Sequence, residues 1–143
     1  MAARRETALA AFTAALAANL DAAYSVVRDR TAPLLDDYSV TVIEGAHRAQ
    51  EFAARDDVAL QVTVTACRLA LAADDVGAAA SQLHADIVAA ALADVTLGGA
   101  ADHVRQIGMD DPEQSFVKGR RSDVLVAVNF LIEFQTQPGD PST

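Results

Sequence analysis

The sequence is poor in several residue types that other protein classes depend on. Its 143 residues include one cysteine, no tryptophan and a single lysine. With Cys67 alone, an internal disulfide or a cysteine-based zinc site is excluded. No apolar run approaches the roughly 20 residues that a membrane-spanning helix needs. The segment 1–21 carries acidic residues and lacks the apolar block of a secretory signal, so we expect neither secretion nor membrane insertion.

Positive charge is also scarce. The net charge is -9 and the isoelectric point is about 4.5. Proteins that wrap a nucleic-acid backbone or sit on an anionic membrane need clustered lysine and arginine. The charge balance therefore argues against both kinds of partner.

The residues that are present suit one folded domain. Apolar residues make up 52% of the chain and charged residues 22%, which allows a packed core. We predict a single domain over residues 1–137. The last residues, 138–143, read Pro-Gly-Asp-Pro-Ser-Thr, a composition that predicts a flexible tail.

Two segments show helical periodicity. Apolar residues at three- and four-residue steps predict a helix over 4–30, ended by Pro33, and a second over 75–95. Asp74 or Asp75 is the expected N-cap of the second helix, and Gly98-Gly99 is the expected stop. The first stripe consists of Leu9, Phe12, Leu16, Leu20, Ala23 and Val27; the second of Val76, Ala80, Leu83, Ile87, Ala90 and Ala91.

Four segments alternate between two faces and therefore predict strands. They cover residues 38–44, closed by Gly45, then 57–69, 103–109 and 122–136. We interpret 47–57 as a loop or short helix and 112–122 as a turn-rich connection. The order of elements predicts an α+β fold, in which two main helices pack on one face of an antiparallel or mixed sheet of about four strands.

The last predicted strand has two different faces. One face is apolar and should meet the helices; it comprises Val124, Val126, Val128, Phe130, Ile132 and Phe134. We expect Phe130 and Ile132 to be buried together with Val62 and Leu16. The other face is semi-polar, as expected of a solvated or partner-facing surface; it comprises Leu125, Ala127, Asn129, Leu131, Glu133 and Gln135.

No catalytic or metal-binding pattern stands out. His47, His84 and His103 have no neighbours at ligand spacing, and Cys67 falls in mid-strand, where a small buried apolar residue is the better interpretation. Acidic pairs flank the predicted elements, as loop ends and helix caps do: Asp36-Asp37, Asp56-Asp57, Asp74-Asp75 and Asp110-Asp111. We expect no enzyme activity and no cofactor.

One basic cluster remains, in the segment Val-Lys-Gly-Arg-Arg-Ser-Asp. Lys118, Arg120 and Arg121 could bind a phosphate. In so acidic a protein, ion pairs with acidic residues of a neighbouring subunit are the favoured interpretation. The expected acidic partners at such an interface are the loop pairs Asp56-Asp57 and Asp110-Asp111.

Several stretches together give a resemblance to a known family. A helix leads to the strand YSVTVIEGA, and the long strand VALQVTVTACRLA follows. A second helix then runs into ADVTLGGAADHVRQIGMDD, which contains a D-x-T-L-G-G stretch, and the last strand ends in IEFQTQPGDPST. Over nearly its whole length, the chain resembles the tail terminator or tail completion proteins of long-tailed bacteriophages and gene transfer agents.

The resemblance implies a structural role rather than a reaction. Such proteins close a hexameric ring on the end of the tail tube, stop its polymerisation and offer a surface for the head. The implied partners are further copies of the chain, the major tail tube protein and the head–tail connector or stopper protein. DNA would pass through the lumen without specific binding. The implied location is the neck end of the virion tail, after assembly in the cytoplasm of the bacterial host.

Two alternatives stay open at this point. The chain could be another head–tail joining or tail tube protein of a virion, although a tube protein should have longer loops and a second strand pair. A small ligand-binding α+β domain is the other alternative, and it would need a pocket with convergent polar groups.

Overall fold

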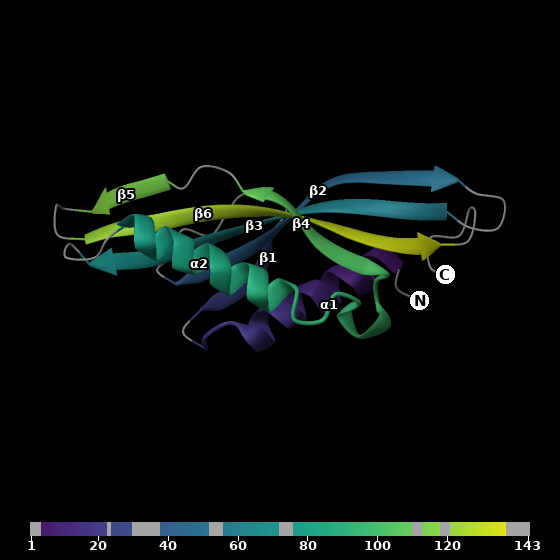
Figure 1. The fold of residues 1–143 in the computed structure, drawn as a ribbon, viewed down its shortest axis with the longest axis horizontal. Coiled ribbons are helices and arrows are strands. Elements are labelled where there is room, and N and C mark those ends of the chain that lie inside the picture. Colours follow the sequence, from purple (N-terminus) through teal and green to yellow (C-terminus); the bar gives the residue numbers. More distant parts are fainter. Residues whose placement is uncertain are drawn as a thin grey trace.

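In the computed structural model, helices cover one face of a mixed sheet, which confirms the predicted α+β class (Figure 1). The structure describes residues 4–22, 24–29, 38–51, 56–71, 76–109, 113–117 and 121–136. The two α-helices of this described part are α1 (Arg4–Asn19) and α2 (Val76–Ala91), and both lie on the same side of the sheet.

The sheet contains six strands in the described residues, rather than about four. They are β1 (Ser25–Asp29), β2 (Ser39–Glu51), β3 (Asp56–Leu71), β4 (His103–Met109), β5 (Glu113–Val117) and β6 (Arg121–Thr136). The order is β1-β2-β3-β6-β4, and β5 also pairs with β6. Because β3 occupies one edge of β6 along its whole length, β4 and β5 share the other edge. The pairing of β1 with β2 is parallel, and all the other pairings are antiparallel.

Strands β3 and β6 are the long central strands of the sheet. They pair antiparallel without interruption from Asp56 opposite Thr136 to Leu71 opposite Arg121. Both are rich in β-branched residues that alternate between the two faces, which is why the predicted strands 57–69 and 122–136 are confirmed. The strands cross in the middle of the view and spread at both ends, as a strongly twisted sheet does (Figure 1).

The first helix is shorter than predicted. It ends at Asn19 instead of residue 30, and Ser25–Asp29 forms β1, paired parallel with the start of β2. Val26 and Val27 are β-branched and lose side-chain freedom in a helix, while pairing with β2 satisfies their backbone groups. The predicted end of this helix at Pro33 lies outside the described residues.

The second strand is longer than predicted. The prediction closed it at Gly45, with a loop or short helix after it, whereas β2 continues to Glu51. Its register shifts between Glu44 and His47, which marks a bulge. A Cβ atom at position 45 would lie 2.9 Å from the backbone oxygen of Gln61. Gly45 therefore lets two strands approach closely instead of ending one of them.

Of the remaining elements, some match the predicted bounds and others differ from them. Strand β4 matches the prediction, and α2 falls within the predicted range of 75–95 but ends at Ala91. The segment 113–117, predicted as part of a turn-rich connection, is a strand because its backbone pairs with residues 121–125 of β6. The expected N-cap residues Asp74 and Asp75 lie outside the described part of the chain.

A continuous apolar core lies between the helices and the sheet. Leu16, Val62, Phe130 and Ile132 are all fully buried in it, as predicted. The rings of Phe12 on α1 and Phe130 on β6 meet edge to face, with 5.6 Å between their centroids. This aromatic contact fixes α1 against the centre of the sheet.

Ion pairs tie the start of α1 to the edge of the sheet. Glu44 on β2 accepts hydrogen bonds from Arg5 on α1, at 2.7 Å, and from Arg28 on β1. Arg28 also pairs with Glu6 on α1. The pKa of Arg28 is raised, first by its hydrogen bond to Glu6 and then by Glu44, so this guanidinium stays charged. The network holds β1 at the sheet edge, where it has one strand neighbour.

Candidate functional site

The face of the sheet that points away from the helices is the candidate site. Among the described elements, both helices pack on the opposite face (Figure 1). Near the start of β6, three residues of this face are buried: Ser39, Thr41 and Cys67. Over the rest, the side chains are partly exposed: Ile43, Ala59, Gln61, Thr63, Thr65, Leu125, Ala127, Asn129, Leu131, Glu133 and Gln135.

This face mixes apolar and polar side chains across neighbouring strands. The hydroxyl of Thr63 on β3 donates a hydrogen bond of 2.8 Å to the side-chain oxygen of Asn129 on β6. Ile43 lies beside Thr63 on β2, and Leu131 lies two residues beyond Asn129 on β6; both add apolar surface near that pair. A face of this composition is intermediate between a core and a fully solvated surface.

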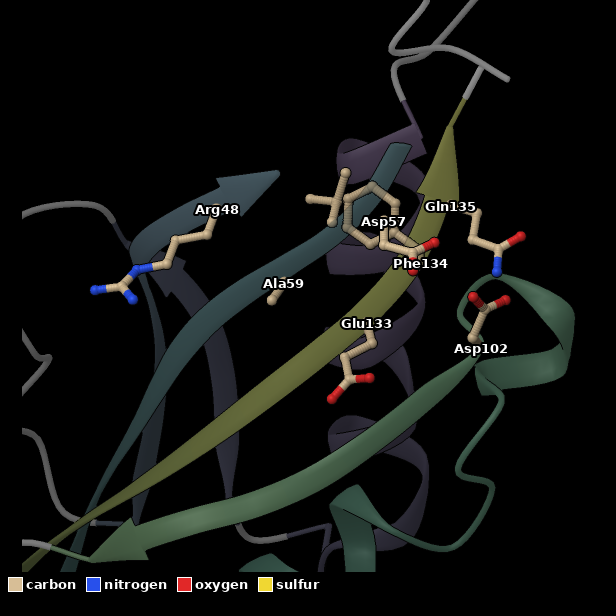
Figure 2. Close-up of a pocket in the computed structure, with 8 residues that line it drawn as sticks. Arg48, Asp57, Ala59, Asp102, Glu133, Phe134 and Gln135 are labelled. Carbon is tan, nitrogen blue, oxygen red and sulfur yellow. The ribbon is translucent and has the colours of Figure 1, made fainter. Parts of the chain in front are cut away.

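A groove of about 580 Å³ lies on this face, where β6 ends and β3 begins. Four segments of the chain build it: the far half of β2, the start of β3, the residue before β4 and the end of β6 (Figure 2). The lining residues are Arg48, Asp57, Val58, Ala59, Asp102, Glu133, Phe134 and Gln135. The antiparallel pairing of β3 with β6 places Ala59 directly opposite Glu133 at the floor.

The groove has an acidic lining. Among the described residues that line it, Asp57, Asp102 and Glu133 supply three carboxylates and Arg48 supplies one guanidinium. At the rim, the Nε atom of Arg105 lies 3.1 Å from a carboxylate oxygen of Glu133. Both side chains of that ion pair are well exposed, so water screens it and it contributes little to stability.

A tight turn places the start of β4 beside the groove, and it is formed by the D-x-T-L-G-G stretch. The Asp94 carboxylate accepts hydrogen bonds from the Thr96 hydroxyl, the Thr96 amide and the Gly98 amide, at 2.8–3.0 Å. Leu97 and Gly98 both have positive φ, at 51° and 67°, which costs energy at the non-glycine residue. The turn then delivers the Asp102 amide to the Glu133 carbonyl oxygen, 2.8 Å away.

The stability of this turn should depend on pH through Asp94. Hydrogen bonds from Thr96 and Gly98 hold the pKa of Asp94 below its ordinary value of 3.8. A group with a lowered folded pKa stabilises the fold above its unfolded pKa, and this contribution is lost as pH falls through the folded value. We expect Asp94→Ala to destabilise the protein at pH 7 and to have a smaller effect below pH 3.8.

Urea unfolding at pH 7 and at successively lower pH checks this expectation. Thr96→Val, which removes the hydroxyl donor and keeps the two amide donors, should weaken the pH dependence without abolishing it. An Asp94→Ala effect that is the same at every pH would show that the carboxylate charge does not stabilise the turn.

The predicted interface residues fall in different places. Asp57 lines the groove, and Asp56 is the first residue of β3. Arg121 is the first residue of β6. Lys118, Arg120, Asp110 and Asp111 lie outside the described residues. Arg48, Asp102 and Glu133 could not be grouped from the sequence, because only the strand pairing brings them together.

The histidines and the cysteine have ordinary surroundings where the structure describes them. His84 on α2 accepts a hydrogen bond from the Gln106 side chain on β4, at 2.7 Å, and His103 is exposed at the start of β4. Cys67 is buried, as predicted. Across the described ranges, no group of three or more His, Cys, Asp or Glu side chains is placed to hold a metal ion.

Comparison with known proteins gives no assignment. No protein-family model matches the sequence, and no curated protein matches it. Neither α-helix in the described part of the chain is long and apolar enough to cross a membrane.

Proposed function

We propose that the protein is a structural virion protein that caps the tail tube of a long-tailed phage or gene transfer agent. In this role it forms a ring on the tube end, stops polymerisation and presents a surface for joining the head. Its partners are other copies of the chain, the major tail tube protein and the head–tail connector or stopper protein. DNA passes through the ring without specific binding.

The observation that carries this proposal is the sheet face on which neither of the two described α-helices packs. Two helices complete the core on one side of the sheet, and the other side keeps a partly apolar surface around Ile43 and Leu131. Such a surface is stabilised when a protein partner excludes water from it. The proposal also rests on the resemblance in sequence pattern. The D-x-T-L-G-G stretch, which is part of that resemblance, forms an ordered turn.

The net charge agrees with a ring through which DNA moves. A protomer with a net charge of -9 repels phosphate groups, which favours passage of DNA over retention. Another head–tail joining or tail tube protein would use the same kind of sheet face, and it is the second candidate.

A small ligand-binding domain is the less favoured alternative. The volume of the groove falls within the usual range for small-molecule sites. Such sites are mostly apolar and enclosed, whereas this groove lies on a sheet face and has charged walls.

The experiment is to remove the reading frame from the particle genome that encodes it and to examine the tails by electron microscopy. We expect tails of abnormal length that fail to join heads, because nothing ends tube growth or offers the joining surface. Supplying the protein in trans should restore tails of uniform length. Normal tails on filled heads in the deletion strain would contradict the proposed function.

A further inference from the structure

Arg68 is a half-buried arginine on the side of the sheet where the helices pack. It continues the core-facing series of β3, two residues after the fully buried Ala66, and it pairs with Val124 of β6, which is also fully buried. Directly paired residues of neighbouring strands point to the same face of a sheet. The Arg68 side chain therefore starts from the core side, although it remains partly exposed.

The guanidinium of Arg68 carries a donor that has no acceptor. Its Nε atom is buried and has no hydrogen-bond partner among the described residues. The ion pairs of the described residues are made by Arg5, Arg28 and Arg105, and Arg68 is not among them. A donor that is withdrawn from water without gaining an acceptor costs free energy, which an incoming acceptor would recover.

Two tyrosines lie beside this arginine. Ser39 of β2 pairs with Cys67 of β3, so Tyr38, the residue before Ser39, comes level with Arg68. The Tyr24 ring meets the Tyr38 ring edge to face, with 5.6 Å between the centroids. A phenol hydroxyl can donate a hydrogen bond to an oxygen acceptor. The three side chains thus combine one positive charge with two further groups that can donate.

The electrostatics of Tyr24 place the Arg68 charge close to its phenol. Burial raises the pKa of Tyr24, the positive charge of Arg68 acts against that rise, and the negative charge of Asp86 on α2 adds to it. The Asp86 carboxylate accepts a hydrogen bond of 2.8 Å from Gln82, one turn earlier on the same helix. Asp86 is thus engaged on its own helix, and its ion pair with Arg68 is absent from the described part of the chain.

We propose that Arg68, Tyr24 and Tyr38 form a binding site for one oxyanion group, either a carboxylate or a phosphate-type anion. A guanidinium offers Nε–H and the neighbouring Nη–H as two parallel donors, which carboxylates and phosphates accept in bidentate form. Bound in this way, the anion supplies the acceptor that the Arg68 Nε atom lacks. Because Nε is shielded from water, the anion reaches it through a shift of the surrounding side chains. The site goes beyond the proposed role in the tail and does not depend on it.

The two tyrosines also report on this site. The chain has no tryptophan and no tyrosine besides these two, so its tyrosine fluorescence comes from the proposed site. The full-length protein is titrated with sodium sulfate and with sodium acetate, each against sodium chloride at equal ionic strength. We expect a saturable change in fluorescence with an oxyanion and none with chloride. A stronger response to sulfate assigns the site to phosphate-type ions, and a stronger response to acetate assigns it to carboxylates.

Three variants identify the group that binds the anion. Arg68→Met removes the guanidinium and should weaken binding about tenfold or more, as expected when charge-assisted hydrogen bonds are lost. Arg68→Lys keeps the charge without the planar pair of donors, so it should retain only part of the affinity. Arg105→Met is the matched control, because Arg105 is a strand arginine at the rim of the groove, and it should bind like the unmodified protein. Circular dichroism establishes that each variant is folded.

Three results would overturn the site. They are the absence of a saturable response in the unmodified protein, an unchanged response in Arg68→Met, and an equal loss in Arg105→Met. Full affinity in Arg68→Lys would show that charge alone attracts the anion, and it would overturn the bidentate geometry.

Discussion

Phe130→Ala is expected to lower the free energy of unfolding by about 3–5 kcal/mol, the usual loss when a buried phenylalanine is truncated. Phe130 is fully buried at the centre of β6, opposite Val62 on β3 and in edge-to-face contact with Phe12 on α1. Truncation leaves a cavity between the sheet and the helix, and the three elements around it cannot all close inward. Urea unfolding of the purified variant measures the change.

The matched control is the next residue on the same strand. Leu131 is also a large apolar residue, but it lies on the sheet face away from the two described helices and is partly exposed. Leu131→Ala should therefore cost less than Phe130→Ala, because part of the Leu131 side chain is already in contact with water and its loss leaves no enclosed cavity. If the two losses were reversed, the register of β6 would be shifted by one residue, and every side chain would change face.

The long strands could be predicted from sequence because one signal dominates them. Between Val58 and Cys67, and again between Val124 and Gln135, every second residue is apolar, and the residues between them are a mixture of apolar and polar types. Alternation over ten or more residues fits a strand and misfits a helix. The burial of Leu16, Val62 and Phe130 follows from the same periodicity, applied to each element in turn.

The errors occurred where tertiary pairing decides the structure. Val27 continues the helical stripe of α1 by chance, and a five-residue strand is too short to show its own period. Gly45 suggests the end of a strand, but its function is the close approach to Gln61. Strand β5 has no clear pattern and depends on its pairing with β6.

Only part of the candidate site could be predicted, because most of its residues come together through strand pairing. Asp57 was identified because an acidic pair at the edge of an element is visible in sequence. The groove also requires Arg48, Asp102 and Glu133, which are separated by dozens of residues and belong to different strand ends. Only the order of the sheet brings them to one corner. The semi-polar face of the last strand was the one sequence signal that pointed to this surface.

Glu44→Gln is expected to lower the free energy of unfolding by about 2 kcal/mol, which is less than the 3–5 kcal/mol found when a fully buried ion pair loses one partner. Glu44 is the shared acceptor of Arg5 and Arg28, and its side chain is only 14% exposed. The amide retains the shape of the side chain but removes the charge that both guanidinium groups face. Arg28, at 22% exposed, then keeps Glu6 as its acidic partner.

Glu6→Gln is the control within the same network. The Glu6 side chain is 50% exposed, so water screens its pairing with Arg28, and its replacement should cost less than about 1 kcal/mol. Unfolding at low and high salt separates the two sites, because salt screens the exposed pair more than the enclosed one. The loss for Glu44→Gln should therefore persist at 1 M salt, while that for Glu6→Gln should fade. Equal, salt-sensitive losses at both positions would mean that Glu44 acts as a surface charge, and that backbone pairing with β2 and apolar packing hold β1 at the sheet edge without it.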